Sequence, residues 1–487
     1  MTAAEGRVAF ASLRRIVPHR RSGLWVGAES LMGAAVSLCG LLLIARMIGP
    51  DAAGTGAVAT SIFLLLDMPA ASLFGDALLQ RRDLEERHRS SAFWATLIVA
   101  TAAAAVLFLL APFLALAVGR SEIGAMLRVL ACLLPISAAA GLLAALLLRT
   151  QHYRLLAARA LFCQPFAIAA GVAVAHAGGG AWALVTQQVT ATVGVALLLA
   201  IRVPWRPRMQ RPKRTDLADL WPVAGPQVVA LFLLSARYRL FVAVLGVLAD
   251  EAVVALTHVA FRFFEVVSSI VAGAVGRLAM PRLAALQHDR HALAETYGDL
   301  TQLQALIALP AAAGLAIVTP QLVELLLGSA WSAAAAPARL LALGVALTAL
   351  IGPSRALWLA VARTQVSLVM QLLSTALPLA ALLIVMPNDP YAAAACWVFA
   401  AIAVVPPEGA MALRQLGRGL PWLIRCVLPA LVGTVALLAG SASVLAWTAG
   451  MPPWIALVLA GLAGAVCLAA GVLLTLGGKP ARALRVI

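Results

Sequence analysis

Long apolar runs recur along the whole chain, and they restrict it to one kind of fold. Each run approaches the roughly 20 residues that a helix needs to cross the hydrocarbon of a bilayer. Of the 487 residues, 63% are hydrophobic and 11% are charged, whereas a soluble domain carries roughly 25% charge. The sequence therefore predicts an all-α integral membrane protein with about fourteen transmembrane helices, at residues 24–48, 52–78, 92–118, 125–148, 160–174, 181–201, 220–248, 253–279, 300–319, 336–361, 366–386, 392–413, 422–447 and 454–476.

The basic residues predict the orientation of these spans. The formal net charge is +16, but its distribution argues against a nucleic-acid partner. When residues near the ends of the spans are counted with the adjoining connections, 28 of the 36 lysines and arginines fall on one side, and Arg120, Arg128 and Arg339 fall on the other. Positive residues accumulate on the cytoplasmic side of membrane proteins. We therefore expect a multi-pass membrane protein with both termini in the cytoplasm.

A basic, proline-rich stretch divides the chain into two halves. The sequence RVPWRPRMQRPKRTD (202–216) resists packing because of its prolines and like charges. Arg149-Thr150-Gln151 recurs as Arg363-Thr364-Gln365, at the same cytoplasmic end of a span. We therefore predict two six-helix repeats in parallel orientation. The predicted divisions are a basic cytoplasmic segment (1–23), a first bundle (24–201), the linker (202–219), a second bundle (220–413), and two last helices with a cytoplasmic tail (414–487).

Two arginines lie just past the middle of one predicted span. An arginine at that depth costs about 2.5 to more than 10 kcal/mol unless a water-filled cavity, a counter-ion or an anionic ligand meets it. Arg237 and Arg239 are about 200° apart around a helix axis, so they cannot face the same cavity. We expect one of them to line a cavity and the other to pair with an acid. Arg239 shares a helical stripe with Ser235, which favours Arg239 as the cavity residue; the alternative is that both are structural.

Three further arginines are cavity candidates, each with a competing structural role. Arg262 and Glu265 lie three residues apart on one helix face and can neutralise each other. Arg46 lies near the periplasmic end of its span, where its side chain can reach the interface. Arg355 follows a Gly-Pro pair that can break the helix and direct freed carbonyls into the cavity.

Acidic residues inside spans are candidates for proton or Na⁺ coupling, because a buried carboxyl can load and release a proton. The candidates are Asp67, Glu29, Asp76 and Glu265, and Asp67 precedes a proline that can bend the helix. Glu408 follows two prolines near the cytoplasmic end and is expected to be solvated. The seven histidines and six cysteines show no metal-ligand spacing, so no bound metal, disulfide framework or other cofactor is expected.

Several segments resemble the polysaccharide-transporter branch of the multidrug/oligosaccharidyl-lipid/polysaccharide (MOP) exporter superfamily. They are ARMIGPDAAGTGAVA (45–59), LLQRRDLEERHRSSAFW (78–94), GAWALVTQQ (180–188), PWRPRM (204–209) and the segment 280–331, which ends in LLGSAW. The resemblance covers roughly residues 24–415. It implies a V-shaped pair of six-helix bundles that flips an oligosaccharide linked to a lipid pyrophosphate from the cytoplasmic leaflet, by alternating access, for lipopolysaccharide or exopolysaccharide assembly.

The arginine-rich interior suits that cargo, because a guanidinium group binds pyrophosphate through two hydrogen bonds and stays charged. The partners implied are the lipid-linked oligosaccharide, membrane lipids, and a polysaccharide polymerase or other assembly machinery. One alternative is a cation-coupled multidrug exporter, for which acids and aromatic residues suit the ligand better. A second is a membrane glycan polymerase or glycosyltransferase. Short predicted periplasmic connections without paired acids disfavour an enzyme.

Overall fold

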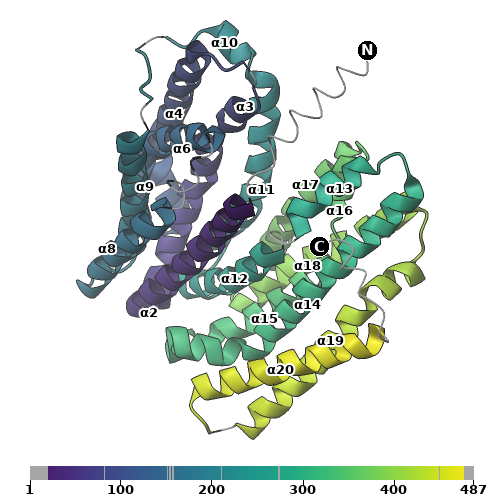
Figure 1. Ribbon diagram of the computed structural model, residues 1–487. Helices are drawn as coiled ribbons and strands as arrows, with labels where there is room; N and C mark the ends of the chain where they lie inside the picture. The colour runs from purple at the N-terminus through teal and green to yellow at the C-terminus, as the bar shows by residue number, and fades with distance from the viewer. Residues whose placement is uncertain are drawn as a thin grey trace, which may run out of the picture.

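The computed structural model describes residues 20–476, except 82, 151, 153–154, 156–157, 204, 210, 272–274 and 449. The basic segment 1–23 therefore falls mostly outside the described residues, and so does the tail 477–487. The described part is helical throughout (Figure 1). Its first half contains α2 (Arg20–Ser72), α3 (Gly75–Gln80), α4 (Glu86–Val118), α5 (Ser121–Ala131), α6 (Leu133–Arg149), η2 (Arg159–Cys163), α8 (Gln164–His176) and α9 (Trp182–Arg202).

The short α10 (Arg214–Ala218) ends the linker, and the longer helices of the second half follow. These are α11 (Trp221–Leu248), α12 (Glu251–Val271), α13 (Arg277–Ala285), α14 (Arg290–Leu327), η4 (Ser329–Ala334), α15 (Ala335–Leu350), α16 (Ser354–Ala360), α17 (Thr364–Val385), α18 (Pro390–Leu416), α19 (Leu420–Trp447) and α20 (Pro453–Leu476). Most neighbouring helices join through short turns, whereas residues 203–213 separate α9 from α10.

The all-α membrane fold is confirmed, but the expected number of spans is not. Eleven helices among the described residues are long and apolar enough to cross a membrane, or twelve when the bent α11 counts as one span. Two expected spans lie within the single helical element α2, and another consists of the short η2 and α8. The count is lower because the two spans of α2 are counted as one helix and because Leu161–His176 is shorter than the 18 residues required of a span.

Gly49 breaks α2 where the sequence places a turn between its first two spans. Its dihedral angles are φ 79° and ψ 171°, outside the helical region, and Pro50 follows. A residue with a side chain avoids this positive φ, whereas glycine adopts it readily. An unbroken helix over the 53 residues of α2 would measure about 80 Å, far more than a bilayer. The break therefore allows α2 to supply two spans.

The packing of the two halves is different at the two ends of the molecule. We call the end that carries residues 203–213 the linker end and the opposite one the far end. Near the far end, one continuous cluster of buried apolar side chains joins α2, α4 and α5 to α11, α12, α14 and α18. Toward the linker end the buried clusters are separate, one on α3, α4, α6 and the start of α11, another on α13, α14, α16 and α18. The halves form a V that is closed at the far end (Figure 1).

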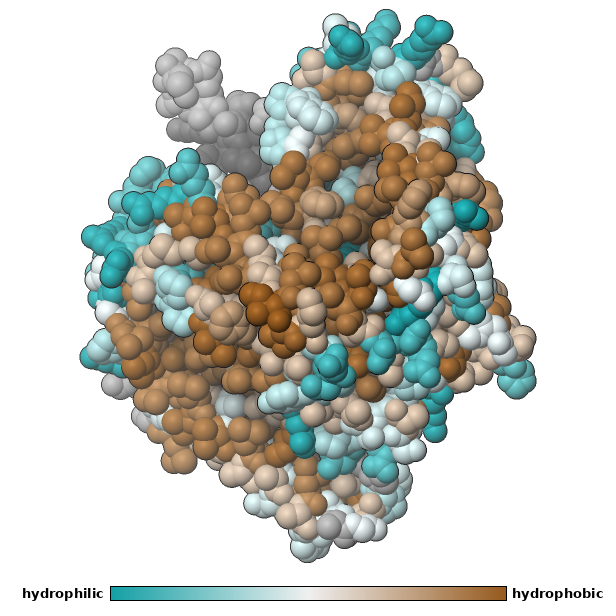
Figure 2. Space-filling view, turned by 180° about the vertical axis from the view of Figure 1, so that it is seen from behind, coloured by the Kyte–Doolittle hydropathy of each residue, from teal (hydrophilic) through white to brown (hydrophobic). Residues whose placement is uncertain are grey.

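The outer surface fits a membrane environment. Figure 2 shows hydrophobic residues over much of the middle of the face that it draws, with hydrophilic residues at the upper edges and in the lower right of the view. Large apolar side chains such as Phe113, Leu116 and Val466 are 68%, 80% and 69% exposed. Exposed apolar area on this scale is unfavourable in water and neutral in lipid. The chain is therefore a multi-pass membrane protein.

Candidate functional site

α11 is bent, and its two arginines lie just beyond the bend and point in different directions. The segments Trp221–Leu233 and Ala236–Leu248 meet at an angle of 45°. Arg237 lies just beyond the bend, and its guanidinium carbon is 4.1 Å from the centre of the Trp397 ring on α18. Arg239 points toward the other half, where its Nη2 lies 3.5 Å from the Sδ atom of Met68 on α2. The two side chains therefore serve different surfaces, as their spacing requires.

A cavity of about 380 Å³ lies beside this bend, inside the second half. Its volume falls within the range of roughly 300–1,000 Å³ that is typical of ligand pockets. Its walls come from α11, α14, α15, α17 and α18 and from the Gly-Pro break between α15 and α16. Two arginines, one glutamate and several hydroxyl and amide side chains line it: Arg237, Arg355, Glu408, Gln304, Thr348, Ser354, Ser367, Gln371 and Ser374.

Two residues of the cavity lining carry buried hydrogen-bond donors without a partner. The buried Nε of Arg237 and the buried amide nitrogen of Gln371 have no hydrogen-bond partner among the described residues. Unpaired buried donors are rare in proteins because each one costs about 1–3 kcal/mol. With two arginines against one glutamate, the lining has an excess of one positive charge. The cavity is therefore equipped to accept a polar anion.

One of the two arginines of α11 lines this cavity, and the preference for Arg239 as the residue that meets a substrate stays a prediction. Arg237 lines it, and Arg239 does not. The preference for Arg239 used a helical stripe that includes Ser235, whose side chain lies outside the described residues. That stripe assumes a straight helix, whereas α11 bends between 233 and 236. Arg355 does line the cavity, just after the break at Gly352, where the backbone adopts a φ of 70°.

The sequence analysis expected Glu408 to be solvated, and the structure contradicts this. It is half-buried, it lines the cavity, and it accepts a hydrogen bond of 2.7 Å from the Ser354 hydroxyl. Gln304 and Thr348 were also missed. A polar stripe gives a signal for the cavity in the sequence: Ser367, Gln371 and Ser374 are spaced four and three residues apart on α17, and that spacing places them on one helix face.

A second polar cluster lies where the two halves meet. Asp67 lies on α2, and its buried Oδ1 atom has no hydrogen-bond partner among the described residues. Arg239 contacts the adjacent Met68. The expected ion pair within α12 is present, since Arg262 donates to Glu265 at 2.9 Å. This cluster therefore brings together both charge signs between helices of the two halves.

His258 is a packed polar residue in the same region. Its Nδ1 lies 2.6 Å from the Tyr238 hydroxyl, and the two rings stack with their centres 5.9 Å apart. His258 is 7% exposed. Its polar contact with a neighbouring helix satisfies one ring nitrogen. Within the described residues, no group of three or more His, Cys, Asp or Glu side chains is arranged to hold a metal ion.

Two arginines instead join the halves near the far end. Arg46 on α2 donates to the carbonyl oxygen of Leu325 on α14 at 3.1 Å. Arg120 forms an ion pair with Glu251 and donates to the carbonyl oxygen of Ala249 at 3.4 Å. These contacts span the two halves, so they stabilise the closed far end rather than line the cavity.

Asp76 is not brought to the cavity. It lies in the first turn of the short α3, it is half-buried, and it is not among the described residues that line the cavity. The side chain of Glu29 lies outside the described residues, so its role stays a prediction.

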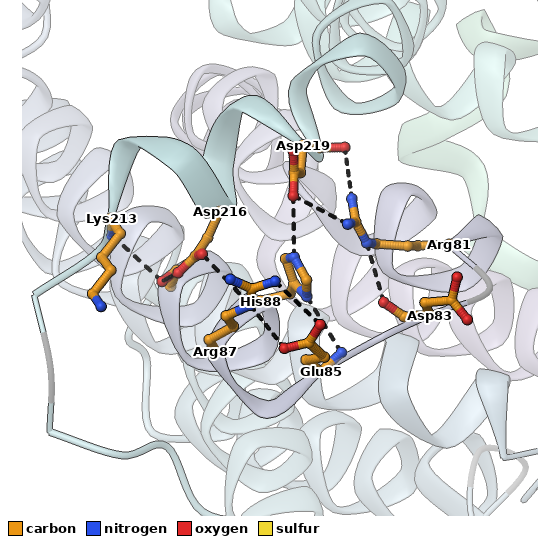
Figure 3. Close-up of polar contacts among 9 residues, drawn as sticks. Arg81, Asp83, Glu85, Arg87, His88, Lys213, Asp216 and Asp219 are labelled. Carbon is orange, nitrogen blue, oxygen red and sulfur yellow. Dashed lines mark hydrogen bonds and ion pairs between the residues drawn. The ribbon is translucent and has the colours of Figure 1, made fainter.

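A network of charges fastens the linker to the first half (Figure 3). Asp219 accepts from Arg81 at 3.1 Å, and its Oδ2 lies 3.4 Å from Nε2 of His88. Because Nδ1 of His88 accepts the backbone N–H of Glu85, we assign the proton of the neutral ring to Nε2, which donates to Asp219. This hydrogen bond, with Arg81, holds the pKa of Asp219 below its usual value. Asp216 is buried and accepts from the Ser91 hydroxyl at 2.8 Å.

The fold and its polar cavity define a multi-pass α-helical membrane protein built of two helical halves. The chain is similar to the solved structure of the lipid II flippase MurJ in its inward closed conformation. That match has a TM-score of 0.74 and 10% identity, and it covers 93% of this chain and 99% of that one. A multidrug resistance MATE family transporter of the MOP superfamily, in its inward-facing conformation, matches with a TM-score of 0.64 and 16% identity, over 79% of this chain and 94% of that one.

The sequence identifies the family. A family model described as polysaccharide biosynthesis protein matches residues 43–336, and the chain belongs to this family. The succinoglycan biosynthesis transport protein ExoT of Rhizobium meliloti (strain 1021) is 27% identical over 306 residues, 62% of this chain. The teichuronic acid biosynthesis protein TuaB of Bacillus subtilis (strain 168) is 21% identical over 281 residues, 57% of this chain. The matches span 60% and 57% of these relatives' own lengths. The resemblance to the MOP superfamily is confirmed.

Proposed function

We propose that this protein flips an oligosaccharide linked to a lipid pyrophosphate across the bacterial inner membrane, by alternating access, for lipopolysaccharide or exopolysaccharide assembly. The names of the relatives support a role in polysaccharide export. The fold supports a flippase, because it resembles the lipid II flippase MurJ more closely than the MATE transporters. The excess of arginine over acid in the cavity also disfavours a multidrug cation as the cargo.

The observation that carries this proposal is the pair of arginines in the cavity beside the bend of α11. Arg237 and Arg355 supply fixed positive charge, and guanidinium groups bind phosphate oxygens in pairs of hydrogen bonds. The surrounding hydroxyl and amide groups, such as Ser374 and Gln371, suit the hydroxyl groups of a sugar. A polar anion with attached sugar can therefore replace its water contacts inside the membrane while its lipid tail stays in the bilayer.

The orientation follows from the charge distribution. In this proposal the linker end is cytoplasmic, and both termini lie in the cytoplasm. The V is closed at the far end, so the cargo would enter from the cytoplasmic leaflet and leave when the far end opens. A polysaccharide polymerase or other assembly machinery would receive it there. The reaction breaks no covalent bond, so the protein acts as a transporter and not as an enzyme.

Asp67 is the proposed coupling residue. Its unpartnered Oδ1 lies at the junction of the halves, beside the residue that Arg239 contacts. A carboxyl group there can take up a proton or Na⁺ in one conformation and lose it in the other. Transport in proteoliposomes should then depend on a proton or Na⁺ gradient in wild type. Under this proposal Asp67→Asn removes that dependence.

The test combines a host deletion with matched variants. Loss of the gene should leave the lipid-linked oligosaccharide in the cytoplasmic leaflet and abolish the surface polysaccharide, and the wild-type gene should restore both. Arg237→Gln and Arg355→Gln should each lower the transport rate at least tenfold, since a charge-assisted hydrogen bond contributes about 1.5–3 kcal/mol. Arg425→Gln is the control, because Arg425 is exposed on α19 and does not line the cavity.

Two outcomes would contradict the proposal. Normal surface polysaccharide in the deletion strain, with no second transporter present, would exclude the flippase. Gradient-dependent export of organic cations by the purified protein would favour the multidrug exporter instead. If all three arginine variants restore transport equally well, the protein is still a flippase, but the cavity is not its substrate-binding site.

A further inference from the structure

A groove on the outside of the first half is separate from the cavity just described. It has a volume of about 570 Å³ and lies between α4, α6 and α9. Alanines give it room, with Ala139 and Ala140 on α6 and Ala196 and Ala200 on α9. Larger apolar side chains of the same helices form the rest of its walls. Such a groove inside the hydrocarbon layer accepts an alkyl chain.

The groove has the depth of one leaflet. Along α6 its lining runs from Pro135 to Leu143. At 1.5 Å per residue this stretch measures about 12 Å, and half of the hydrocarbon core is about 15 Å thick. On α4 the groove begins with Phe93, near the helix start, and reaches Leu97. The groove therefore extends from the linker end to about the middle of the membrane.

The linker borders the groove at the linker end of the molecule. Trp205, Arg206 and Pro207 line it there, so its polar end carries a guanidinium group. Arg206 is exposed, and its Nη1 donates to the carbonyl oxygen of Val203 at 2.6 Å. Exposed arginines at 202 and 208 flank it. The acidic group at this mouth is Glu86, whose Oε1 accepts the Trp205 indole N–H at 2.7 Å.

The linker is held firmly enough to keep this basic rim in place. Trp94 donates its indole N–H to the carbonyl oxygen of Arg208 at 2.8 Å. The backbone N–H of Arg208 donates to the Ser90 hydroxyl at 3.3 Å. The backbone N–H of Lys213 donates to the Ser91 hydroxyl at 3.4 Å (Figure 3). These bonds hold residues 208 and 213 against α4, and Arg206 lies in the sequence between this attachment and the end of α9 at Arg202.

We propose that this groove is a binding site for an anionic phospholipid of the leaflet at the linker end. One acyl chain fills the space between α4, α6 and α9, and the phosphate of the headgroup pairs with Arg206. An arginine at a membrane surface attracts anionic lipid with a free energy of about 1 kcal/mol. The bound lipid joins the linker to the first half, which must move relative to the second during transport. The proposal does not depend on the identity of the cargo.

The test counts lipids on the purified full-length protein by native mass spectrometry, from equimolar phosphatidylglycerol and phosphatidylcholine. Wild type should retain phosphatidylglycerol preferentially. Arg206→Gln should lower that preference about fivefold, the change that corresponds to one arginine at the membrane surface. Arg211→Gln should leave it unchanged, because Arg211 is equally exposed in the linker but does not line the groove.

A second pair of variants tests the acyl-chain part of the site independently. Ala196→Phe fills the groove and should reduce the number of retained lipids of both kinds. Ala105→Phe adds the same bulk at an exposed position of α4 outside the groove and should not. Ala200→Phe replaces the first variant if that protein does not fold. Size-exclusion chromatography of each variant checks its folding.

Three results would overturn the proposal. One is a wild-type protein without preference for phosphatidylglycerol. Another is an equal loss of preference in Arg206→Gln and Arg211→Gln, which would show attraction by the basic linker as a whole. The third is unchanged lipid retention in both groove-filling variants.

Discussion

Removing Arg120 should loosen the closed far end. Arg120 lies in the turn between α4 and α5, and its ion pair with Glu251 joins the first half to the start of α12. Its side chain is 11% exposed and that of Glu251 is 36% exposed. Hydrogen bonds to charged groups contribute about 1.5–3 kcal/mol, and fully exposed pairs contribute about 0.2–1 kcal/mol. We take about 1.5 kcal/mol for this half-buried pair, so Arg120→Ala should raise the ratio of open to closed far ends roughly tenfold.

Spin labels across the far end measure this change. With the native cysteines replaced by alanine, labels at Ala177 and Ser332 report the distance between the α8–α9 turn and η4 by double electron–electron resonance. Arg120→Ala should enlarge the population at long distance. Arg128→Ala is the control, because Arg128 contacts Phe108 within the first half. Identical distance distributions for wild type and Arg120→Ala would show that this pair does not hold the far end closed.

Other changes test the helix contacts and the linker network. Gly54→Ala would place a Cβ atom 2.0 Å from the carbonyl oxygen of Glu251, so the same spin-label pair should report a more open far end; an unchanged distance would contradict this. Gly352→Ala combines a φ of 70°, costing about 1–2 kcal/mol, with a clash against a threonine hydroxyl of α14. Its unfolding temperature and transport rate should both fall, and wild-type values would refute the strain. The hydrogen bond from His88 lowers the pKa of Asp219 in the folded protein. Its stabilising effect is therefore present above about pH 4, the unfolded value, and is lost as the pH falls further. Hydrogen exchange of residues 214–219 should rise in that range for wild type and less for Asp219→Asn; equal profiles would exclude this carboxylate as the cause.

The arginines of α11 show how far local sequence reasoning extends. Their spacing alone predicts that Arg237 and Arg239 face different surfaces, and the structure places them so. The spacing does not identify the surface that each one faces, because the bend of α11 breaks the helical stripe used to choose between them. Arg262 and Glu265 lie within one turn of a helix, so their ion pair followed from the sequence.

Glu408 shows the complementary limit. Its neighbours in the sequence indicate a solvated helix end, whereas Ser354, which lies 54 residues earlier, provides its hydrogen bond. The cavity likewise draws on helices separated by more than a hundred residues, from Leu233 to Glu408. The lipid groove needs α4, α6, α9 and the linker together. The residue pattern within one helix cannot predict contacts between residues that lie so far apart in the sequence.

The sequence by itself determined that this protein lies in a membrane and that its secondary structure is helical. A run of about 20 apolar residues must pair its backbone groups internally in lipid, so it forms a helix whatever surrounds it. The break at Gly49 and the basic linker are equally local. The tertiary structure decided which charges share a cavity, which end is closed and where a groove remains. Those features come from the packing of helices against each other, and packing depends on side-chain shapes contributed from the whole chain.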